Sequence, residues 1–490
     1  MYDATFRIPG HTMVEHRLEA PLDRFGAFDR LTAGSTASQP ARPSSPGPEE
    51  PAPAAPGAAG SEAPGAPQEG TGRKETAAAP TRIEIFAREY VREGREDRPR
   101  LVYFQGGPGF PAPRMAPIGS WLSTALDHYR VVLLDERGTG SSHPLDAQAV
   151  TDVGGPGAQA AYLSCFRQDS IVADAEDLRR ALQDEPWSAL GQSFGGFAVT
   201  AYLSQAPAGL SEAFITAGLP SVVDHADAVY RLTYVETDKR NREFFARYPG
   251  DEATAWSIAR HLADVEETLP TGERLTPGRF RQIGGVLGRS YGLERLHFLL
   301  EDAFRTERGS RRLRPQFLAR IGAEVSLRAS PLYGVMHEAI YAQASTGATA
   351  WSAHRVRGEF LQFRLPDLAE GGAGEAELEA EGHGFRFTGE HMYPWQMRED
   401  PALAPMADAA DLLAADAALP ELYSAEALAA NTVPSAAWIY TPPDMFVPHS
   451  LSERTAELAG IERIVSTEFH HDALHSGGPK MIEKLIAAVR

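Results

Sequence analysis

Short apolar runs alternate with helical stretches along the first part of the chain. The runs 101–104 and 131–134 each end in a glycine-containing loop, and 187–190 and 213–216 continue the pattern. Such runs are typical of strands buried on both faces of a parallel sheet. A helical stretch at Ile171–Leu182 lies among them. The alternation predicts an α/β fold, with a mainly parallel sheet and helices on both faces.

The pattern changes after Leu219. Most of the next 210 residues are predicted to be helical, and strand-like runs return at Ala436–Tyr440 and Arg463–Glu468. A sheet that resumes after a long helical block indicates a cap inserted into the core. The predicted organisation is a first core segment at 1–219, a helical cap domain at 220–430 and a second core segment at 431–490.

Two segments depart from this pattern in composition. Thr36–Arg82 contains no Val, Ile, Leu, Met, Phe, Tyr or Trp, so it cannot bury enough apolar area to offset its ordering entropy. We predict a disordered Pro/Ala/Gly-rich insertion between strands at His16–Leu22 and Ile83–Val91. Its alternative role is a docking site for a proline-binding partner. The acidic, glycine-rich stretch Pro366–Gly384 is predicted to be an exposed loop.

Charge and cysteine content narrow the function. The 490 residues carry a net charge of −19, which argues against binding to nucleic acid or to an anionic membrane. Cys165 is the single cysteine, so an intrachain disulfide and a thiolate-based zinc site are excluded. The N-terminus lacks a signal-peptide pattern, and no run of about 18–20 apolar residues is present. These features predict a cytoplasmic protein.

Two glycine-rich motifs indicate acyl-transfer chemistry. Gly191–Gly195 (GQSFG) is a Gly-x-Ser-x-Gly sequence between a strand and a helix, which is the context of a nucleophile elbow with Ser193 at its tip. Gln105–Gly109 (QGGPG) follows the strand 101–104. A backbone N–H of this loop and the N–H of Phe194 would form an oxyanion hole.

A serine nucleophile needs a base and an orienting acid, which follow in the order Ser, Asp, His in hydrolases of this kind. Asp444 follows the predicted strand Ala436–Tyr440, and His471 follows the next one. A metal reading of His470, His471 and His475 is weaker, because no His-Glu-x-x-His motif is present. Arg137, in a glycine-rich turn after the strand 131–134, is expected to bind a carboxylate of the scaffold.

Seven segments resemble the prolyl aminopeptidase (proline iminopeptidase) family of the α/β-hydrolase clan, in its larger bacterial form. The similarity runs over nearly the whole chain apart from the predicted insertion. The segments are Leu101–Pro108 (LVYFQGGP), Leu134–Ser141 (LDERGTGS), Phe166–Asp174 (FRQDSIVAD), Gly191–Gly196 (GQSFGG), Val356–Phe360 (VRGEF), Phe387–Trp395 (FTGEHMYPW) and Glu468–Leu474 (EFHHDAL). Within the second segment, Glu136 stands where many relatives have glutamine.

The resemblance implies Ser193 as nucleophile, Asp444 as orienting acid and His471 as general base. It also implies that the cap holds the amino group of a peptide with N-terminal proline, for which we select Glu338 and Glu390. The alternative for each glutamate is an ordinary salt bridge to Arg355 or Arg357, which lie nearby in the sequence.

The expected reaction is removal of N-terminal proline through an acyl-enzyme, with the N–H groups of Gly107 and Phe194 as the oxyanion hole. It requires no metal and no organic cofactor. One alternative is an esterase or a broader peptidase of the same fold. The alternative from another class is an inactive hydrolase fold that serves as an interaction protein.

Overall fold

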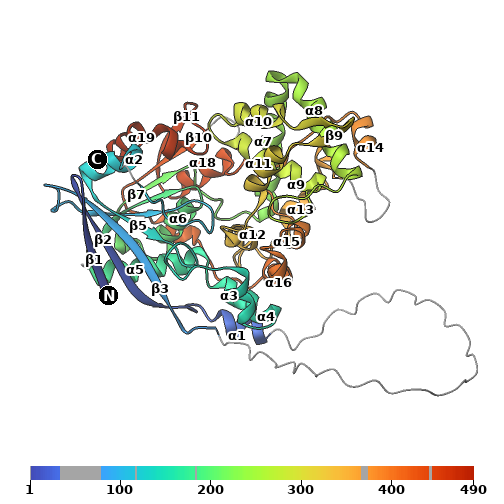
Figure 1. Cartoon of the computed structure of the whole chain (residues 1–490). Helices are drawn as coiled ribbons and strands as arrows, with labels where there is room; N and C mark the ends of the chain where they lie inside the picture. The colour runs from blue at the N-terminus through green and yellow to red at the C-terminus, as the bar shows by residue number, and fades with distance from the viewer. Residues whose placement is uncertain (1, 34–78, 116–117, 183–184, 366–373, 441–443) are drawn as a thin grey trace, which may run out of the picture.

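The protein is described by a computed structural model, which covers residues 2–33, 79–115, 118–182, 185–365, 374–440 and 444–490. Within these residues the largest sheet has nine strands in the spatial order β1-β2-β3-β5-β4-β6-β7-β10-β11 (Figure 1). The strands are β1 (Tyr2–Ile8), β2 (His11–Pro21), β3 (Arg82–Arg92), β4 (Arg100–Phe104), β5 (Arg130–Asp135), β6 (Trp187–Gln192), β7 (Leu210–Thr216), β10 (Ser435–Tyr440) and β11 (Glu462–Ser466).

The sheet is parallel from β5 to β11 and antiparallel at the other edge. The pairs β5–β4, β4–β6, β6–β7, β7–β10 and β10–β11 are parallel. The pairs β1–β2, β2–β3 and β3–β5 are antiparallel. The prediction of a mainly parallel sheet is confirmed, and the antiparallel edge adds β1, which the sequence pattern did not predict.

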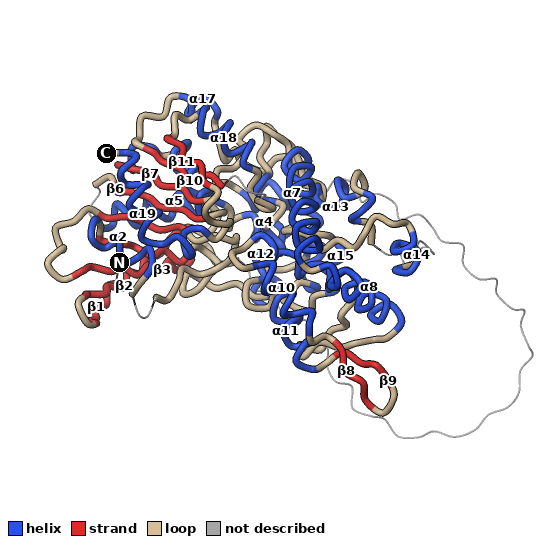
Figure 2. The backbone as a smooth tube through the Cα atoms, turned by 90° about the horizontal axis from the view of Figure 1, so that it is seen from above, coloured by secondary structure: helices blue, strands red, loops and turns tan. Residues whose placement is uncertain are grey.

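Both faces of the central strands are buried under helices (Figures 1 and 2). Side chains alternate between the two faces of a strand. In β4, Leu101 and Tyr103 therefore pack in one apolar cluster with α2 and α19, while Val102 and Phe104 pack in another with α5 and α6. This explains why the core strands read as unbroken apolar runs. The four helices are α2 (Ser120–His128), α19 (Ala473–Val489), α5 (Gln168–Leu182) and α6 (Phe194–Gln205).

Smaller helices complete the core; in the sequence they lie before β7 or after β10. They are α1 (Ala27–Ala33), α3 (Ala147–Asp152), α4 (Pro156–Ser164), η2 (Pro207–Gly209) and α18 (His449–Leu458).

The region between β7 and β10 is mostly helical, as expected. Its elements are α7 (Ala226–Arg247), α8 (Pro249–Asp264), α9 (Pro277–Arg281), η3 (Gln282–Gly288), α10 (Gly292–Glu301), β8 (Phe304–Glu307), β9 (Ser310–Leu313), α11 (Pro315–Val325), α12 (Pro331–Met336), η4 (Ala339–Tyr341), α13 (Ser352–Arg357), η5 (Leu361–Phe363), α14 (Glu375–Ala380), α15 (Pro394–Glu399), η6 (Ala404–Met406), α16 (Ala407–Ala414) and α17 (Ala425–Ala429).

One predicted helix in this region is too long. The pattern at Leu293–Arg305 indicated a single helix, but α10 ends at Glu301 and the chain turns into the β8–β9 hairpin. The turn residues Arg308 and Gly309 have φ values of 48° and 82°. Positive φ at both central residues is the geometry that two-residue hairpin loops favour.

The position of the helical region relative to the sheet can be compared with the predicted cap domain at 220–430. Helices α7 to α15 stand to one side of the sheet (Figure 1). The end of the region differs, because α16 packs against α4 and α17 packs against α6 of the core. The predicted boundaries at 219/220 and 430/431 fall in the loops that follow β7 and precede β10. The cap as a separate domain stays a prediction.

The predictions for the two segments of unusual composition have different outcomes. Residues 36–78 of the predicted insertion 36–82 lie outside the described residues. Its last residue, Arg82, begins β3. The predicted acidic loop lies outside them at 366–373, but the rest carries α14. There Glu375 is only 2% exposed and binds both terminal nitrogens of Arg281, at 2.5 and 2.8 Å. The exposed-loop prediction is wrong at this residue, because Glu375 neutralises a buried arginine.

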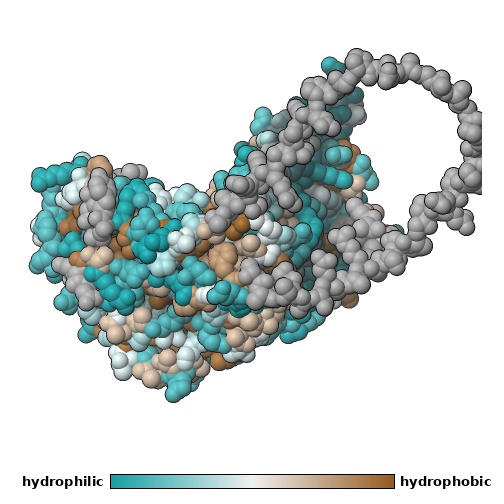
Figure 3. All heavy atoms as spheres, turned by 90° about the horizontal axis from the view of Figure 1, so that it is seen from below, coloured by the Kyte–Doolittle hydropathy of each residue, from teal (hydrophilic) through white to brown (hydrophobic). Residues whose placement is uncertain are grey.

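The surface fits the charged composition. Hydrophilic residues are spread over the face seen in Figure 3. Among the described helices, none combines the length and the apolar character that a membrane crossing requires. The cytoplasmic location stays a prediction.

Candidate active site

Ser193 lies in a tight turn between β6 and α6. Its φ of 55° and ψ of −123° are unusual for a residue with a side chain, and such strained positions cluster at functional sites. The Ser193 N–H donates to the carbonyl of Thr216 at 2.9 Å. A Cβ on Gly195 would lie 2.1 Å from the carbonyl oxygen of Phe104. The small residues of the motif are therefore needed where the helix passes close to the sheet.

Two side chains from loops after later strands reach this serine. His471 follows β11, and its Nε2 lies 2.8 Å from Ser193 Oγ. Its Nδ1 lies 3.0 Å from Oδ2 of Asp444, which follows β10. Asp444 is 4% exposed and His471 is 9% exposed. The structure thus joins three residues separated by up to 278 positions into one hydrogen-bonded chain.

The surroundings of His471 shift its pKa. Burial alone would lower the pKa of His471, but the charge and the hydrogen bond of Asp444 outweigh it, and the pKa lies above its ordinary value. The other Asp444 oxygen accepts from the N–H groups of Phe446 and Val447, at 2.9 and 3.1 Å. With Nδ1–H bound to Asp444, the Nε2 of His471 is free to accept the serine proton.

The two candidate oxyanion donors lie in segments that adjoin the serine. Phe194 is the first residue of α6, so its N–H has no acceptor within the helix. A Cβ on Gly106 would lie 3.2 Å from Ser193 Cβ, so the loop that contains Gly107 touches the nucleophile. Gly107 has a φ of 148°, which favours glycine.

A buried carboxyl group lies next to the same loop. Glu136 follows β5 and is 2% exposed, and its Oε1 has no hydrogen-bond partner among the described residues. Burial raises the pKa of Glu136 well above its ordinary value. A backbone hydrogen bond from Gln105 opposes this rise, and the Asp135 charge adds to it. Burial therefore favours the neutral acid to higher pH in the folded protein than in the unfolded chain.

Glu136→Gln is expected to stabilise the protein as the pH rises. Below the ordinary carboxyl pKa, the wild-type acid is neutral both folded and unfolded, and the variant gains little. Between that value and the raised folded pKa only the unfolded wild-type chain is ionised, so the wild-type protein loses about 1.4 kcal/mol of unfolding free energy per pH unit. Denaturant unfolding at pH 5 to 8 measures the difference.

Glu93→Gln is the matched control, because Glu93 is exposed. A stability difference between Glu136→Gln and wild type that does not grow with pH would contradict a neutral Glu136.

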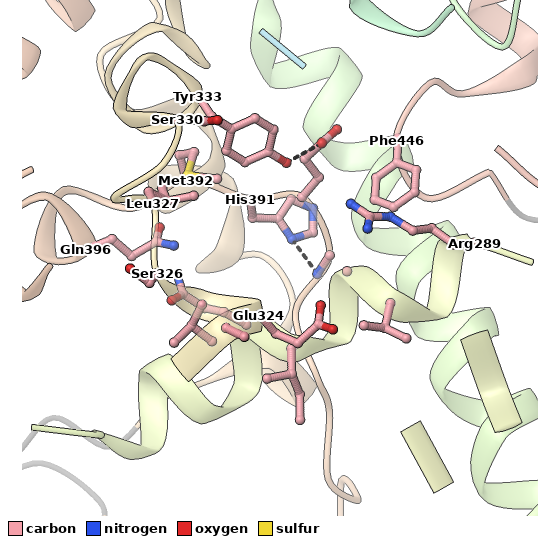
Figure 4. Close-up of a pocket in the computed structure, with 18 of the residues that line it drawn as sticks. Arg289, Glu324, Ser326, Leu327, Ser330, Tyr333, His391, Met392, Gln396 and Phe446 are labelled. Atoms are coloured by element: carbon pink, nitrogen blue, oxygen red, sulfur yellow. Dashed lines mark hydrogen bonds between the residues drawn. The ribbon is translucent and has the colours of Figure 1, made fainter. Parts of the chain in front are cut away.

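A pocket of about 340 Å³ lies beside the triad histidine, His471 (Figure 4). It is lined by Phe446, whose ring packs on His471 at a centroid distance of 4.6 Å, and by Phe110 from the loop after β4. Glu390 also lines it and accepts a hydrogen bond from the Tyr333 hydroxyl. This places Glu390, one of the two glutamates selected from the sequence, next to the triad.

Further contacts involve Glu390. Oε2 of Glu390 lies 4.0 Å from His337 Nε2. Both ring nitrogens of His337 lack hydrogen-bond partners among the described residues, and burial lowers the pKa of this histidine. A neutral imidazole next to Glu390 leaves the carboxylate charge available to a ligand.

Glu338 has a different environment. It is 3% exposed, and its carboxylate accepts from the N–H groups of Ser352 and Ala353, at 2.9 and 3.3 Å. Burial raises the pKa of Glu338, although these hydrogen bonds oppose the rise. Glu338 is not among the residues that line the pocket. It therefore fixes the start of α13, and the structure does not bring it together with Glu390 in the pocket.

The alternative salt bridges of the two glutamates are not formed. Arg355 binds Asp227 at 2.7 Å, and the guanidinium of Arg357 lies 5.3 Å from the ring centre of Tyr393. The expected scaffold role of Arg137 is confirmed, since its Nε and Nη2 bind the two oxygens of Asp174, both at 2.7 Å.

His470, next to the triad histidine, has a side-chain partner other than a metal. Nδ1 of His470 lies 2.6 Å from the Tyr440 hydroxyl. In the part of the chain that the structure describes, no group of three or more His, Cys, Asp or Glu side chains is arranged to hold a metal ion.

Sequence reasoning missed several residues of the site. Tyr333, His337 and Phe446 all surround the triad or Glu390, but none lies in a spacing pattern that signals a site. Gln192 was also missed; its side-chain amide donates to the His471 carbonyl at 2.8 Å. Its position directly before the serine is a signal that would have found it.

The parallel sheet, the strained serine turn and the Asp–His pair after later strands define an α/β hydrolase. The sequence model of the alpha/beta hydrolase fold family matches residues 99–282. Proline iminopeptidase from Aeromonas sobria is 41% identical over 408 residues, which span 82% of this chain and 91% of that protein. The chain belongs to the proline iminopeptidase family.

Two further comparisons give more distant similarities. Proline iminopeptidase aneH from Aspergillus aculeatus is 30% identical over 402 residues, covering 79% of this chain and 84% of that protein. Among solved structures, a hydrolase from Pseudomonas aeruginosa PA01 has a TM-score of 0.34 at 14% identity, and the match covers 86% of this chain and 98% of that one.

Proposed function

We propose that the protein is a serine aminopeptidase that releases N-terminal proline from peptides. The observation that carries this proposal is the Ser193–His471–Asp444 hydrogen-bonded chain beside a pocket that contains Glu390. The similarity to two proline iminopeptidases supports proline as the released residue.

In the proposed reaction His471 Nε2 takes the proton of Ser193 as the serine oxygen attacks the prolyl carbonyl. Asp444 stabilises the resulting imidazolium. The imidazolium then protonates the departing peptide amine as the C–N bond breaks, which leaves a prolyl ester on Ser193. His471 takes a proton from water as the water oxygen attacks the ester carbonyl, and it returns this proton to Ser193 Oγ as the ester C–O bond breaks and proline leaves. Every proton in this cycle passes through His471, so it needs no metal and no organic cofactor.

Charge on the tetrahedral oxygen requires its own donors. We assign this role to the backbone N–H groups of Gly107 and Phe194. Each such donor contributes about 3 kcal/mol to transition-state stabilisation in related chemistry.

We assign the substrate's amino group to Glu390. A secondary ammonium that leaves water for a pocket needs a carboxylate partner, because an unpaired charge there is costly. The Glu390 side chain is 18% exposed, so a ligand can reach it. Glu338 is proposed to support the site by holding the start of α13, since its oxygens already accept two backbone N–H groups.

Glu390→Gln is expected to lower kcat/KM on a proline arylamide by roughly 30-fold or more, since removing one partner of a buried charge pair costs about 2 kcal/mol or more. An aryl ester without an amino group makes no such pair and should be hydrolysed at the wild-type rate. Parallel assays of wild type and variant on both substrates measure whether kcat/KM falls for the proline arylamide and not for the ester.

Glu324→Gln is the matched control, because Glu324 lines the same pocket but pairs with Arg295 at 3.2 Å. Equal losses of Glu390→Gln on both substrates would argue against amine recognition by Glu390.

The alternative within the same fold is an esterase or a broader peptidase. The pocket favours the aminopeptidase, because an ester without an amino group gives the Glu390 carboxylate no partner. Product analysis of a peptide that begins with proline tests the choice directly: free proline and the shortened peptide are expected. Hydrolysis of short-chain esters with no proline release would support the alternative.

A further inference from the structure

The pocket contains a second charged group that the proposed reaction does not use. Arg289 directly follows η3, is exposed and lines the pocket. Figure 4 shows its guanidinium extending alongside the ring of Phe446 toward the interior of the pocket. Phe446 in turn packs on the imidazole of His471.

Arg289 differs from the other charged residues of the pocket. Glu324 is paired with Arg295, and Glu390 accepts from Tyr333. Among the described residues, the Arg289 side chain makes no hydrogen bond and no ion pair. A guanidinium carries five N–H donors in a fixed fork that matches a carboxylate. The pocket therefore presents an unused carboxylate-binding group.

The backbone on either side of Arg289 is fixed to the loop that carries the base. The His471 N–H donates to the Gly288 carbonyl at 3.4 Å. The N–H and hydroxyl of Ser290 both donate to Oδ1 of Asp472, at 2.9 and 2.7 Å. Arg289 is thus held between two anchors next to His471, which gives its side chain a defined origin at the site.

The proposed reaction indicates what lies there in a substrate complex. His471 protonates the amine of the departing residue, so the Cα of that residue is adjacent to the imidazole. In a dipeptide this Cα also carries the free carboxylate. Glu390 and Arg289 then match the two ends of a zwitterion, and a volume of about 340 Å³ is at the small end of ligand pockets.

We propose that Arg289 binds the α-carboxylate of the departing residue, so that the protein favours dipeptides with N-terminal proline over substrates without that charge. This inference rests on the proposed function. It assigns Arg289 to substrate selection and leaves bond cleavage to the triad.

The test compares kcat/KM for Pro-Ala with that for Pro-Ala amide, which differ only in the carboxylate. We expect wild type to prefer the free acid by at least tenfold, the ordinary scale of one charge-assisted hydrogen bond. Arg289→Met should bring the ratio close to one, and Arg289→Lys should retain part of the preference. Arg247→Met is the matched control, because Arg247 is a half-exposed cap arginine paired with Glu294 and should keep the wild-type ratio.

The outcomes separate the two proposals. A wild-type ratio near one, or a ratio unchanged by Arg289→Met, overturns the role of Arg289 while proline release stands. If wild type releases proline from neither peptide nor from a proline arylamide, the proposed function fails and the inference fails with it.

Discussion

Replacing Ser193 by alanine is expected to lower kcat on a proline arylamide by a factor on the order of 10⁴–10⁶. The serine oxygen is the group that forms the ester, and no other described hydroxyl lies within hydrogen-bond distance of His471 Nε2. Removing a triad nucleophile leaves only the contribution of the oxyanion hole and of substrate binding. Steady-state assays over a range of enzyme concentrations measure the loss.

Ser221→Ala is the matched control for this variant. Ser221 lies after β7 and bonds Asp224, so its loss should leave activity near the wild-type level. A fluorophosphonate probe should label wild type and not Ser193→Ala. Near-normal activity of Ser193→Ala would contradict the triad, and an unlabelled wild type would favour the inactive interaction protein.

Asp444→Asn is expected to lower kcat by roughly 10⁴-fold, because an amide holds the imidazole in the wrong tautomer. It also removes the negative charge that raises the His471 pKa against the effect of burial. Catalysis needs neutral His471, so activity falls as the pH drops through this pKa. The acidic limb of the kcat/KM profile should therefore move to lower pH in the variant.

The pH profile separates this role from a structural one. A variant that was merely misfolded would lose amplitude without moving the acidic limb. An unshifted limb in a folded Asp444→Asn protein would show that Asp444 does not set the His471 pKa.

The triad was predictable because each of its members follows a strand. Strands buried on both faces appear as apolar runs, and the carboxyl ends of parallel strands meet at one edge of the sheet. Chain order then selected Asp444 and His471 from many candidates. The antiparallel strand β1 was missed, because it lies at the sheet edge and carries no such run.

The contacts within the helical region were less predictable, since its residues meet through packing between short helices. Glu390 lies in a segment that resembles the family. Nothing local to Glu338 shows that its carboxylate caps α13, 14 residues further along. Arg289 lies in no motif at all. Only the structure places Arg289 at the site, through the contacts of Gly288 and Ser290 with the loop that carries His471.

The most direct test of an aminopeptidase that selects proline is kcat/KM over a matched set of proline arylamide, alanine arylamide and a short-chain aryl ester. We predict that the proline substrate exceeds the alanine substrate by at least about tenfold, the scale that a shape-selective pocket provides. Proline arylamide turnover at or below that of alanine arylamide, or activity on the ester alone, would contradict the proposed function.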